Sequence, residues 1–217
     1  MQAAPRVDTG LLVLADISGY TAFLSAVAEA HPDMVEPGGH VPAAYPVISS
    51  LLDVVVESLA PTFSLAQVEG DAVFGYASSG GIGTDSEGVL AAIRSAYDAF
   101  RGRLAEARIV QADDCQACLV LGTLELKFVL HAGTYVALSV AGRPQLAGPA
   151  VNLAHRLLKN SVTARTGLRA YLLVTDDAAA NLTLAPGVGL AHEEHYDDAG
   201  IIAGRVVALA DPVRNTA

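Results

Sequence analysis

Tryptophan is absent from this 217-residue chain, cysteine occurs twice, and charged residues make up only 17% of it. Two cysteines are too few for a disulfide framework. Hydrophobic residues reach 52%, which excludes intrinsic disorder over most of the chain, because so apolar a chain can bury enough surface to fold. No apolar run reaches the roughly 18 residues that span a bilayer, and the N-terminus does not read as a signal peptide. We therefore expect a cytoplasmic protein without a membrane segment.

Basic residues are scarce: 13 Lys+Arg face 23 Asp+Glu, and the formal net charge is -10. Such a surface repels phosphates, so we expect no nucleic-acid partner. It would also repel a nucleoside triphosphate, unless bound metal ions or a local cluster of positive groups held that ligand. Only Lys127 and Lys159 are lysines. The mean hydropathy of +0.41 suggests a buried subunit interface, although alanine richness alone could produce it.

The pattern of apolar and polar residues predicts strands mixed with helices and hairpins, which is an α+β fold in a single domain. The domain is expected over residues 10–210, between a flexible N-terminus at 1–9 and a tail at 211–217. Residues 31–46 hold four prolines and two glycines, which predicts a loop or lid. The expected strands are 11–15, 63–68, 72–76, 124–131, 135–140, 170–174, 189–195 and 205–209, and the expected helices are 21–30, 47–59, 89–107, 149–160 and 176–181.

Asp16 and Asp71 each lie where an apolar strand meets a turn, and each has a glycine nearby. A carboxylate in that position can reach a ligand held against the backbone. Two of them on adjacent strands would form an oxygen site for Mg²⁺, which waters and substrate phosphates usually complete. The alternative is that both are ordinary turn aspartates.

The junction between the first strand and the first helix is a candidate phosphate site. Free N–H groups at a helix start can cradle phosphate, although every helix start offers such groups. The chain contains neither of the common glycine-rich phosphate loops. The junction residues are Ile17, Ser18, Gly19, Tyr20 and Thr21.

The expected helix 149–160 carries a polar stripe. At about 100° per residue, Asn152, His155, Arg156 and Lys159 lie within an arc of about 100°. An arginine and a lysine one turn apart beside an asparagine are suited to hold a phosphoryl group as its charge develops. The alternative is a solvated face of an ordinary surface helix.

Four segments in this order resemble the catalytic-domain motifs of class III adenylate/guanylate cyclases, and their local spelling is closest to an uncharacterised bacterial branch of cyclase-like proteins. The segments are Leu14-Ala15-Asp16-Ile17-Ser18-Gly19-Tyr20-Thr21, Val68-Glu69-Gly70-Asp71-Ala72, Leu126-Lys127-Phe128-Val129-Leu130-His131-Ala132-Gly133 and Gly148-Pro149-Ala150-Val151-Asn152-Leu153-Ala154-His155-Arg156. The resemblance covers about residues 10–160. It implies a ferredoxin-like, cyclase-type mixed antiparallel sheet with helices packed on it.

The resemblance also implies roles for individual residues. Asp16 and Asp71 match the aspartates that bind two Mg²⁺ or Mn²⁺ ions. Asn152 matches the asparagine that orients the ribose, and Arg156 matches the arginine that stabilises the transition state. Lys127 takes the place of an arginine that contacts the triphosphate. In this family the site lies at the interface of a head-to-tail homodimer.

Three positions depart from the family pattern. Gln67 and Gln145 replace the lysine and the aspartate that read the base, so the resemblance does not tell adenine from guanine, although two amides can still hydrogen-bond a base. The late triphosphate lysine has no match in residues 197–205, and Lys159 is the candidate substitute.

Cys115 and Cys118 form a C-x-x-C pair, for which two reduced thiols in a loop are the favoured interpretation and bound Zn²⁺ the minor one, since structural zinc needs four ligands. His192-Glu193-Glu194-His195 lacks the spacing of a zinc-protease motif and is interpreted as a polar strand end. His131 is interpreted as a structural histidine near a turn at Gly133.

Three functions remain open at this point. The first is a divalent-metal-dependent cyclase that converts a nucleoside triphosphate to a 3′,5′-cyclic nucleotide and pyrophosphate. The second is a weak or inactive cyclase-like domain that binds a nucleotide or another phosphorylated ligand as a regulatory module. The third, and weakest, is a zinc or thiol sensor built on the two cysteines.

Overall fold

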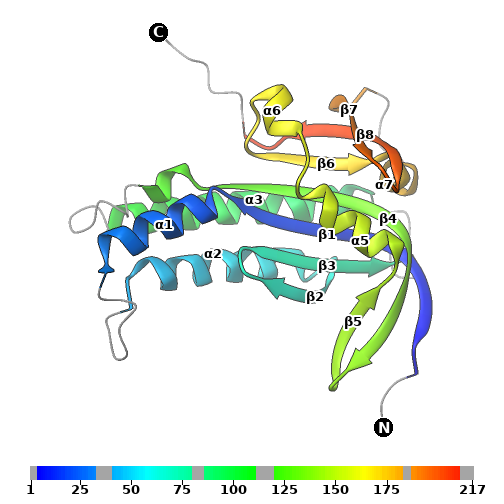
Figure 1. Cartoon of the computed structure of the whole chain (residues 1–217), viewed down its shortest axis with the longest axis horizontal. Coiled ribbons are helices and arrows are strands. Elements are labelled where there is room, and N and C mark those ends of the chain that lie inside the picture. Colours follow the sequence, from blue (N-terminus) through cyan, green and yellow to red (C-terminus); the bar gives the residue numbers. More distant parts are fainter. Residues whose placement is uncertain (1–3, 33–40, 80–85, 111–119, 183–186, 211–217) are drawn as a thin grey trace.

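The computed structural model describes residues 4–32, 41–79, 86–110, 120–182 and 187–210. Its strands form one eight-stranded sheet in the order β2-β3-β1-β4-β6-β8-β7, with β5 paired to β4 (Figure 1). Every strand pairing is antiparallel except β4 with β6. The strands are β1 (Arg6–Ser18), β2 (Ser64–Glu69), β3 (Ala72–Ser78), β4 (Glu125–Val140), β5 (Arg143–Ala147), β6 (Tyr171–Thr175), β7 (Leu190–Tyr196) and β8 (Gly200–Ala208).

Helices cover both faces of this sheet, which explains the continuous apolar run in β1. Leu11, Val13 and Ala15 belong to one buried cluster, and Leu12 and Leu14 to another, because successive strand residues point to opposite faces. The first cluster packs on α1, α2, α3 and α7, and the second on α5. The helices are α1 (Tyr20–Ala30), α2 (Ala44–Leu59), α3 (Ser86–Val110), η2 (a 3-10 helix, Val120–Thr123), α5 (Pro149–Leu157), α6 (Val162–Thr166) and α7 (Asp176–Leu182).

The structure confirms the expected α+β class but moves several boundaries. Strand β1 begins at Arg6, so residues 6–9 are strand rather than part of a loose start. The two strands expected at 124–131 and 135–140 are one strand, β4. Strand β5 and helices α6 and η2 were not predicted.

Gly133, where the sequence suggested a turn, does not interrupt β4. It lies inside the strand and not at a turn, and a Cβ added there would meet the Ala150 Cβ at 2.5 Å. The glycine therefore lets α5 pack directly on β4. The turn in fact comes at Ala141 and Gly142, which have positive φ angles of 50° and 78° and connect β4 to β5. In Figure 1 this β4–β5 hairpin projects beyond the body of the sheet, beside the N-terminal part of the chain.

Two expected features lie partly or wholly outside the described residues. The predicted loop at 31–46 includes residues 33–40, which the structure does not describe, and α2 already begins at Ala44. Cys115 and Cys118 also lie outside the described ranges. Among the helices that are described, none combines the length and the apolar character needed to cross a membrane.

Candidate active site

A first cleft, the carboxylate cleft, has a volume of about 560 Å³ and lies where β1, the β2–β3 turn and the end of α5 meet. The hairpin brings its turn to β1, and the Ile17 N–H donates a hydrogen bond to the Asp71 carbonyl oxygen at 3.1 Å. The cleft therefore gathers both predicted metal ligands, all five junction residues and both lysines. Its lining is Asp16, Ile17, Ser18, Gly19, Tyr20, Thr21, Ala22, Asp71, Lys127, His155, Leu158 and Lys159.

Lys127 holds Asp16 in place from the neighbouring strand. The two residues are opposite each other in the β1–β4 register, and the Lys127 Nζ lies 3.0 Å from the Asp16 Oδ2. Both side chains are only 18% exposed. The same Nζ donates a hydrogen bond to the Leu158 carbonyl at 2.9 Å, which ties the end of α5 to this site. Lys127 therefore links Asp16 to the end of the helix that carries Asn152 and Arg156.

The electrostatics of the pair fit a divalent cation. Burial raises the pKa of Asp71, and the negative charge of Asp16 raises it further, while Lys127 lowers it. The two carboxylates thus repel each other, and Lys127 offsets part of this repulsion. Mg²⁺ usually binds through one or two carboxylates plus waters and substrate phosphates, so this donor set is sufficient. The described ranges contain no group of three or more His, Cys, Asp or Glu side chains that could hold a metal ion, so the two carboxylates of this cleft have no third ligand of these types beside them.

The start of α1 faces the same cleft. Gly19 precedes the helix with a φ of 90°, a left-handed conformation that glycine adopts without strain. No side chain caps this end, and its first turn holds no acidic residue. The free N–H groups of this 11-residue helix are therefore available to an anion.

A second cleft, the arginine cleft, has a volume of about 830 Å³ and lies along β4 beside α5. Asn152 and Arg156, one helical turn apart, line it together with Asp198. The Arg156 Nη1 donates hydrogen bonds to both Asp198 carboxylate oxygens at 2.7 Å. The guanidinium carbon also lies 4.4 Å from the centre of the Tyr196 ring. The two clefts share no lining residue.

The predicted polar stripe is consequently divided. Helix α5 ends at Leu157, so Lys159 lies in the turn after it and not on the same helix face as Arg156. His155 and Lys159 line the carboxylate cleft, whereas Asn152 and Arg156 line the arginine cleft. The expectation that Lys159 continues the stripe was wrong, because the helix stops two residues before it.

Gln67 and Gln145 lie on β2 and β5, and neither lines either cleft. The Gln67 amide donates to the Glu69 carboxylate at 2.5 Å. Their predicted base contacts remain predictions.

His131 is buried and bonds through Nδ1 to the Thr175 hydroxyl at 3.0 Å, and burial lowers its pKa. Its partner is thus a residue at the end of β6, and no turn is involved.

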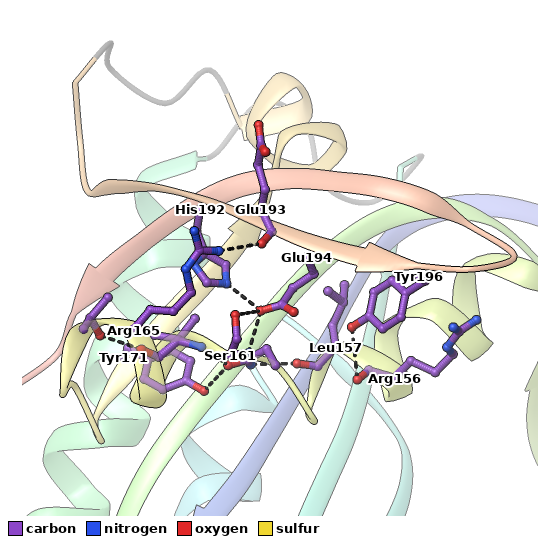
Figure 2. Close-up of polar contacts among 12 residues, drawn as sticks. Arg156, Leu157, Ser161, Arg165, Tyr171, His192, Glu193, Glu194 and Tyr196 are labelled. Carbon is purple, nitrogen blue, oxygen red and sulfur yellow. Dashed lines mark hydrogen bonds and ion pairs between the residues drawn. The ribbon is translucent and has the colours of Figure 1, made fainter.

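The sequence reasoning missed a buried network that anchors the turn after α5 (Figure 2). The Glu194 carboxylate accepts hydrogen bonds from the Ser161 N–H at 2.6 Å and the Ser161 hydroxyl at 2.8 Å, and it lies 2.6 Å from the His192 Nε2. Burial alone would raise the pKa of Glu194, but these hydrogen bonds lower it overall. Strand alternation puts residues 192 and 194 on one face, and that signal could have found the pair.

A sequence model of one family matches residues 48–166, more than half of the chain. Its description is "Protein of unknown function (DUF2652)". The chain belongs to this family. This DUF2652 chain is also 34% identical over 134 residues to "Uncharacterized protein Rv2561/Rv2562" of Mycobacterium tuberculosis. The match covers 61% of the chain and 58% of that relative.

The DUF2652 chain is similar in fold to several solved structures. A bacterial light-regulated adenylyl cyclase matches 99% of the chain with a TM-score of 0.65 at 16% identity, and the chain covers 55% of that structure. The guanylyl cyclase Cya2 matches 99% of the chain with a TM-score of 0.65 at 13% identity, and 98% of that structure is covered. The DUF2652 chain therefore has the fold of class III cyclase catalytic domains, in agreement with the resemblance of its motifs.

Proposed function

We propose that this protein is a divalent-metal-dependent nucleotidyl cyclase that forms a 3′,5′-cyclic nucleotide and pyrophosphate from a nucleoside triphosphate. The observation that carries this proposal is the carboxylate cleft, in which Asp16 and Asp71 meet an uncapped helix start and two lysines. That combination offers oxygen ligands to a cation and positive groups to phosphates in one place.

The predicted site residues are divided between two clefts, and this supports a site shared by two copies of the chain. Asn152 and Arg156 line a different cleft from Asp16 and Asp71, so a single chain does not present all four side chains to one ligand. A twofold-related copy could place its arginine cleft against the carboxylate cleft of the first. We therefore propose a head-to-tail homodimer with two equivalent sites.

In the proposed reaction the ribose 3′-oxygen attacks the α-phosphorus. The new O–P bond replaces the bond to the β-phosphate oxygen, pyrophosphate leaves, and the hydroxyl proton passes to water. Two Mg²⁺ or Mn²⁺ ions held by Asp16 and Asp71 would lower the pKa of the hydroxyl and neutralise phosphate charge. Asn152 orients the ribose, and Arg156 donates hydrogen bonds to the oxygens whose charge grows in the transition state.

Positive groups in the carboxylate cleft hold the rest of the triphosphate. The proposed contacts are the N–H groups at residues 18–21, Lys127 and Lys159; Ile17 lines the cleft, but its N–H already donates to the Asp71 carbonyl oxygen. Lys127 must share its charge between Asp16 and the phosphates. Gln67 and Gln145 remain the proposed base contacts, and their amides offer both donors and acceptors.

The test is formation of cyclic product by purified protein with Mn²⁺ or Mg²⁺ and each of ATP, GTP, CTP and UTP. We expect metal-dependent product from at least one triphosphate, and loss of about a hundredfold or more in Asp16→Ala, since metal catalysis is worth several kcal/mol. Asp53→Ala, an exposed carboxylate on α2, is the matched control and should keep full activity. Equal product from wild type and Asp16→Ala would contradict the proposal.

A second candidate is a regulatory domain that binds a nucleotide without turning it over. The observation that favours it is that Lys127 and Arg156 are already engaged by Asp16 and Asp198. The same preparation distinguishes the two functions. Metal-dependent nucleotide binding with no cyclic product from any of the four triphosphates would support the binding module.

A further inference from the structure

The hairpin between β7 and β8 holds Arg156 from two sides. Asp198, at the turn, accepts two hydrogen bonds of 2.7 Å from the Arg156 Nη1. Tyr196, at the end of β7, presents its ring to the guanidinium with 4.4 Å between the guanidinium carbon and the ring centre. The Tyr196 hydroxyl also donates to the Arg156 carbonyl oxygen at 3.4 Å, a contact drawn in Figure 2. One hairpin therefore contacts both the guanidinium and the backbone carbonyl of Arg156.

The two contacts differ in how readily a ligand could replace them. The Arg156 and Asp198 side chains are 39% and 71% exposed, and an exposed ion pair of this kind is weak and reversible. Both hydrogen bonds leave from one nitrogen, so Asp198 does not occupy the two-nitrogen fork with which arginine binds phosphate best. The guanidinium carbon lies over the Tyr196 ring, and this attraction to the ring face does not require the N–H donors of the fork. A phosphate can therefore replace Asp198 while the arginine stays on the ring.

Asp198 and an anionic ligand would compete for the positive charge of Arg156. The Asp198 pKa is lowered by its hydrogen bond from Arg156, so this carboxylate is ionised at neutral pH. On a chain with a formal net charge of -10, Arg156 is one of few positive groups near the arginine cleft. An incoming phosphate must compete with Asp198 for it.

We propose that Asp198 is a displaceable counter-ion and Tyr196 a fixed platform, which together keep Arg156 at the mouth of the arginine cleft until a phosphate group of the ligand replaces Asp198. Both are positioning residues that act through Arg156. The inference rests on the proposed function in one respect, because it takes the ligand of Arg156 to be a phosphate group.

The experiment measures binding of inorganic tripolyphosphate to the full chain by calorimetry, without divalent metal and at about 0.15 M salt, where distant charges are largely screened. We expect Asp198→Asn to bind about three- to fivefold tighter than wild type, the range that corresponds to loss of an exposed ion pair. Asp197→Asn is the matched control, because Asp197 is an exposed neighbour that forms no ion pair with Arg156 and its loss changes the net charge equally. We expect less than about a twofold effect there.

An Arg156→Ala background shows whether the effect passes through the arginine. There Asp198→Asn should have no more effect than Asp197→Asn. Equal effects of the two substitutions in the wild-type chain, a gain that persists without Arg156, or no tripolyphosphate binding by either wild type or Asp198→Asn would each overturn the proposal.

The role of the Tyr196 ring is tested by comparing a variant that keeps an aromatic ring with one that does not. Tyr196→Phe keeps the aromatic face and should bind within about twofold of wild type, whereas Tyr196→Leu should bind about threefold more weakly. Equal losses in both variants would contradict the platform role.

Product formation by the same proteins distinguishes this inference from the proposed function. Tighter binding through Arg156 with no cyclic product from any variant would leave the inference standing and reject the cyclase. Product from wild type, with Asp198→Asn no different from Asp197→Asn in tripolyphosphate binding, would do the reverse.

Discussion

The carboxylate cleft and the arginine cleft are built in different ways. In the first, Asp16 pairs with Lys127 on the adjacent strand, and both side chains are only 18% exposed. In the second, Arg156 pairs with Asp198, which is 42 residues further along the chain and 71% exposed. The ion pair of the carboxylate cleft is therefore fixed by the sheet itself, while the ion pair of the arginine cleft includes a carboxylate that water already reaches. Helix α5 thus contributes side chains to one cleft with a largely buried ion pair and to another cleft with an exposed one.

The largest expected effect separates the two clefts by what they bind. Asp71→Asn should weaken Mn²⁺ binding by about a hundredfold or more, because it removes one of two carboxylate ligands. Arg156→Ala should leave Mn²⁺ affinity within about twofold, since Arg156 lies in the other cleft. Titration of free Mn²⁺ by electron paramagnetic resonance measures both. Equal losses in the two variants would show that the clefts do not act separately.

A smaller effect is expected from a substitution that moves α5, the helix that contributes to both clefts. Gly133→Ala would bring a Cβ to 2.5 Å from the Ala150 Cβ, so α5 must shift on β4. We expect a loss of about 1–3 kcal/mol in the free energy of unfolding, as for other overpacked cores. Denaturant unfolding measures it. The double variant Gly133→Ala/Ala150→Gly exchanges the two side chains and should recover most of the loss; if it recovers none, close packing of α5 is not the cause.

The smallest expected effect concerns the carboxylate cleft alone, through the turn that carries Lys159. Glu194→Gln should destabilise the protein by about 1–2 kcal/mol at neutral pH, because it weakens the hydrogen bonds to Ser161. The pKa of Glu194 is lowered in the folded chain, so this stability is present above the ordinary glutamate pKa and is lost as the pH falls through the lower, folded value. Unfolding measured from pH 7 down to pH 3 should show the difference from wild type shrinking with acid. A difference that stays constant with pH would contradict this account.

The sequence predicts the carboxylate cleft well because its parts are close together in the chain or are joined by one hairpin. The junction at residues 17–21 follows Asp16 directly, and the turn at Gly70 brings Asp71 back beside the same strand. An apolar run, a turn glycine and a helix start are local patterns, and local patterns suffice to place them.

The arginine cleft could not be predicted in the same way. Its counter-ion Asp198 comes from a hairpin far along the chain, and only tertiary packing brings it to Arg156. The end of α5 was misjudged because the residues after Leu157 are ordinary helix formers. In the structure the chain turns there instead, and the Asn160 side chain accepts a hydrogen bond from the Val162 N–H at the start of α6. Gly133 suggested a turn by its type alone, whereas its role is close approach of a helix.

The most direct test of the central claim is complementation between two inactive variants. Asp16→Ala and Arg156→Ala each damage a different half-site, so an equal mixture that exchanges subunits should contain hybrid dimers with one intact site, and about a quarter of wild-type cyclic product should return. A mixture of Asp16→Ala and Asp71→Ala, which damage the same half-site, should recover nothing. No recovery in the first mixture, although its subunits are shown to exchange, would contradict the claim that each site joins the carboxylate cleft of one chain to the arginine cleft of another.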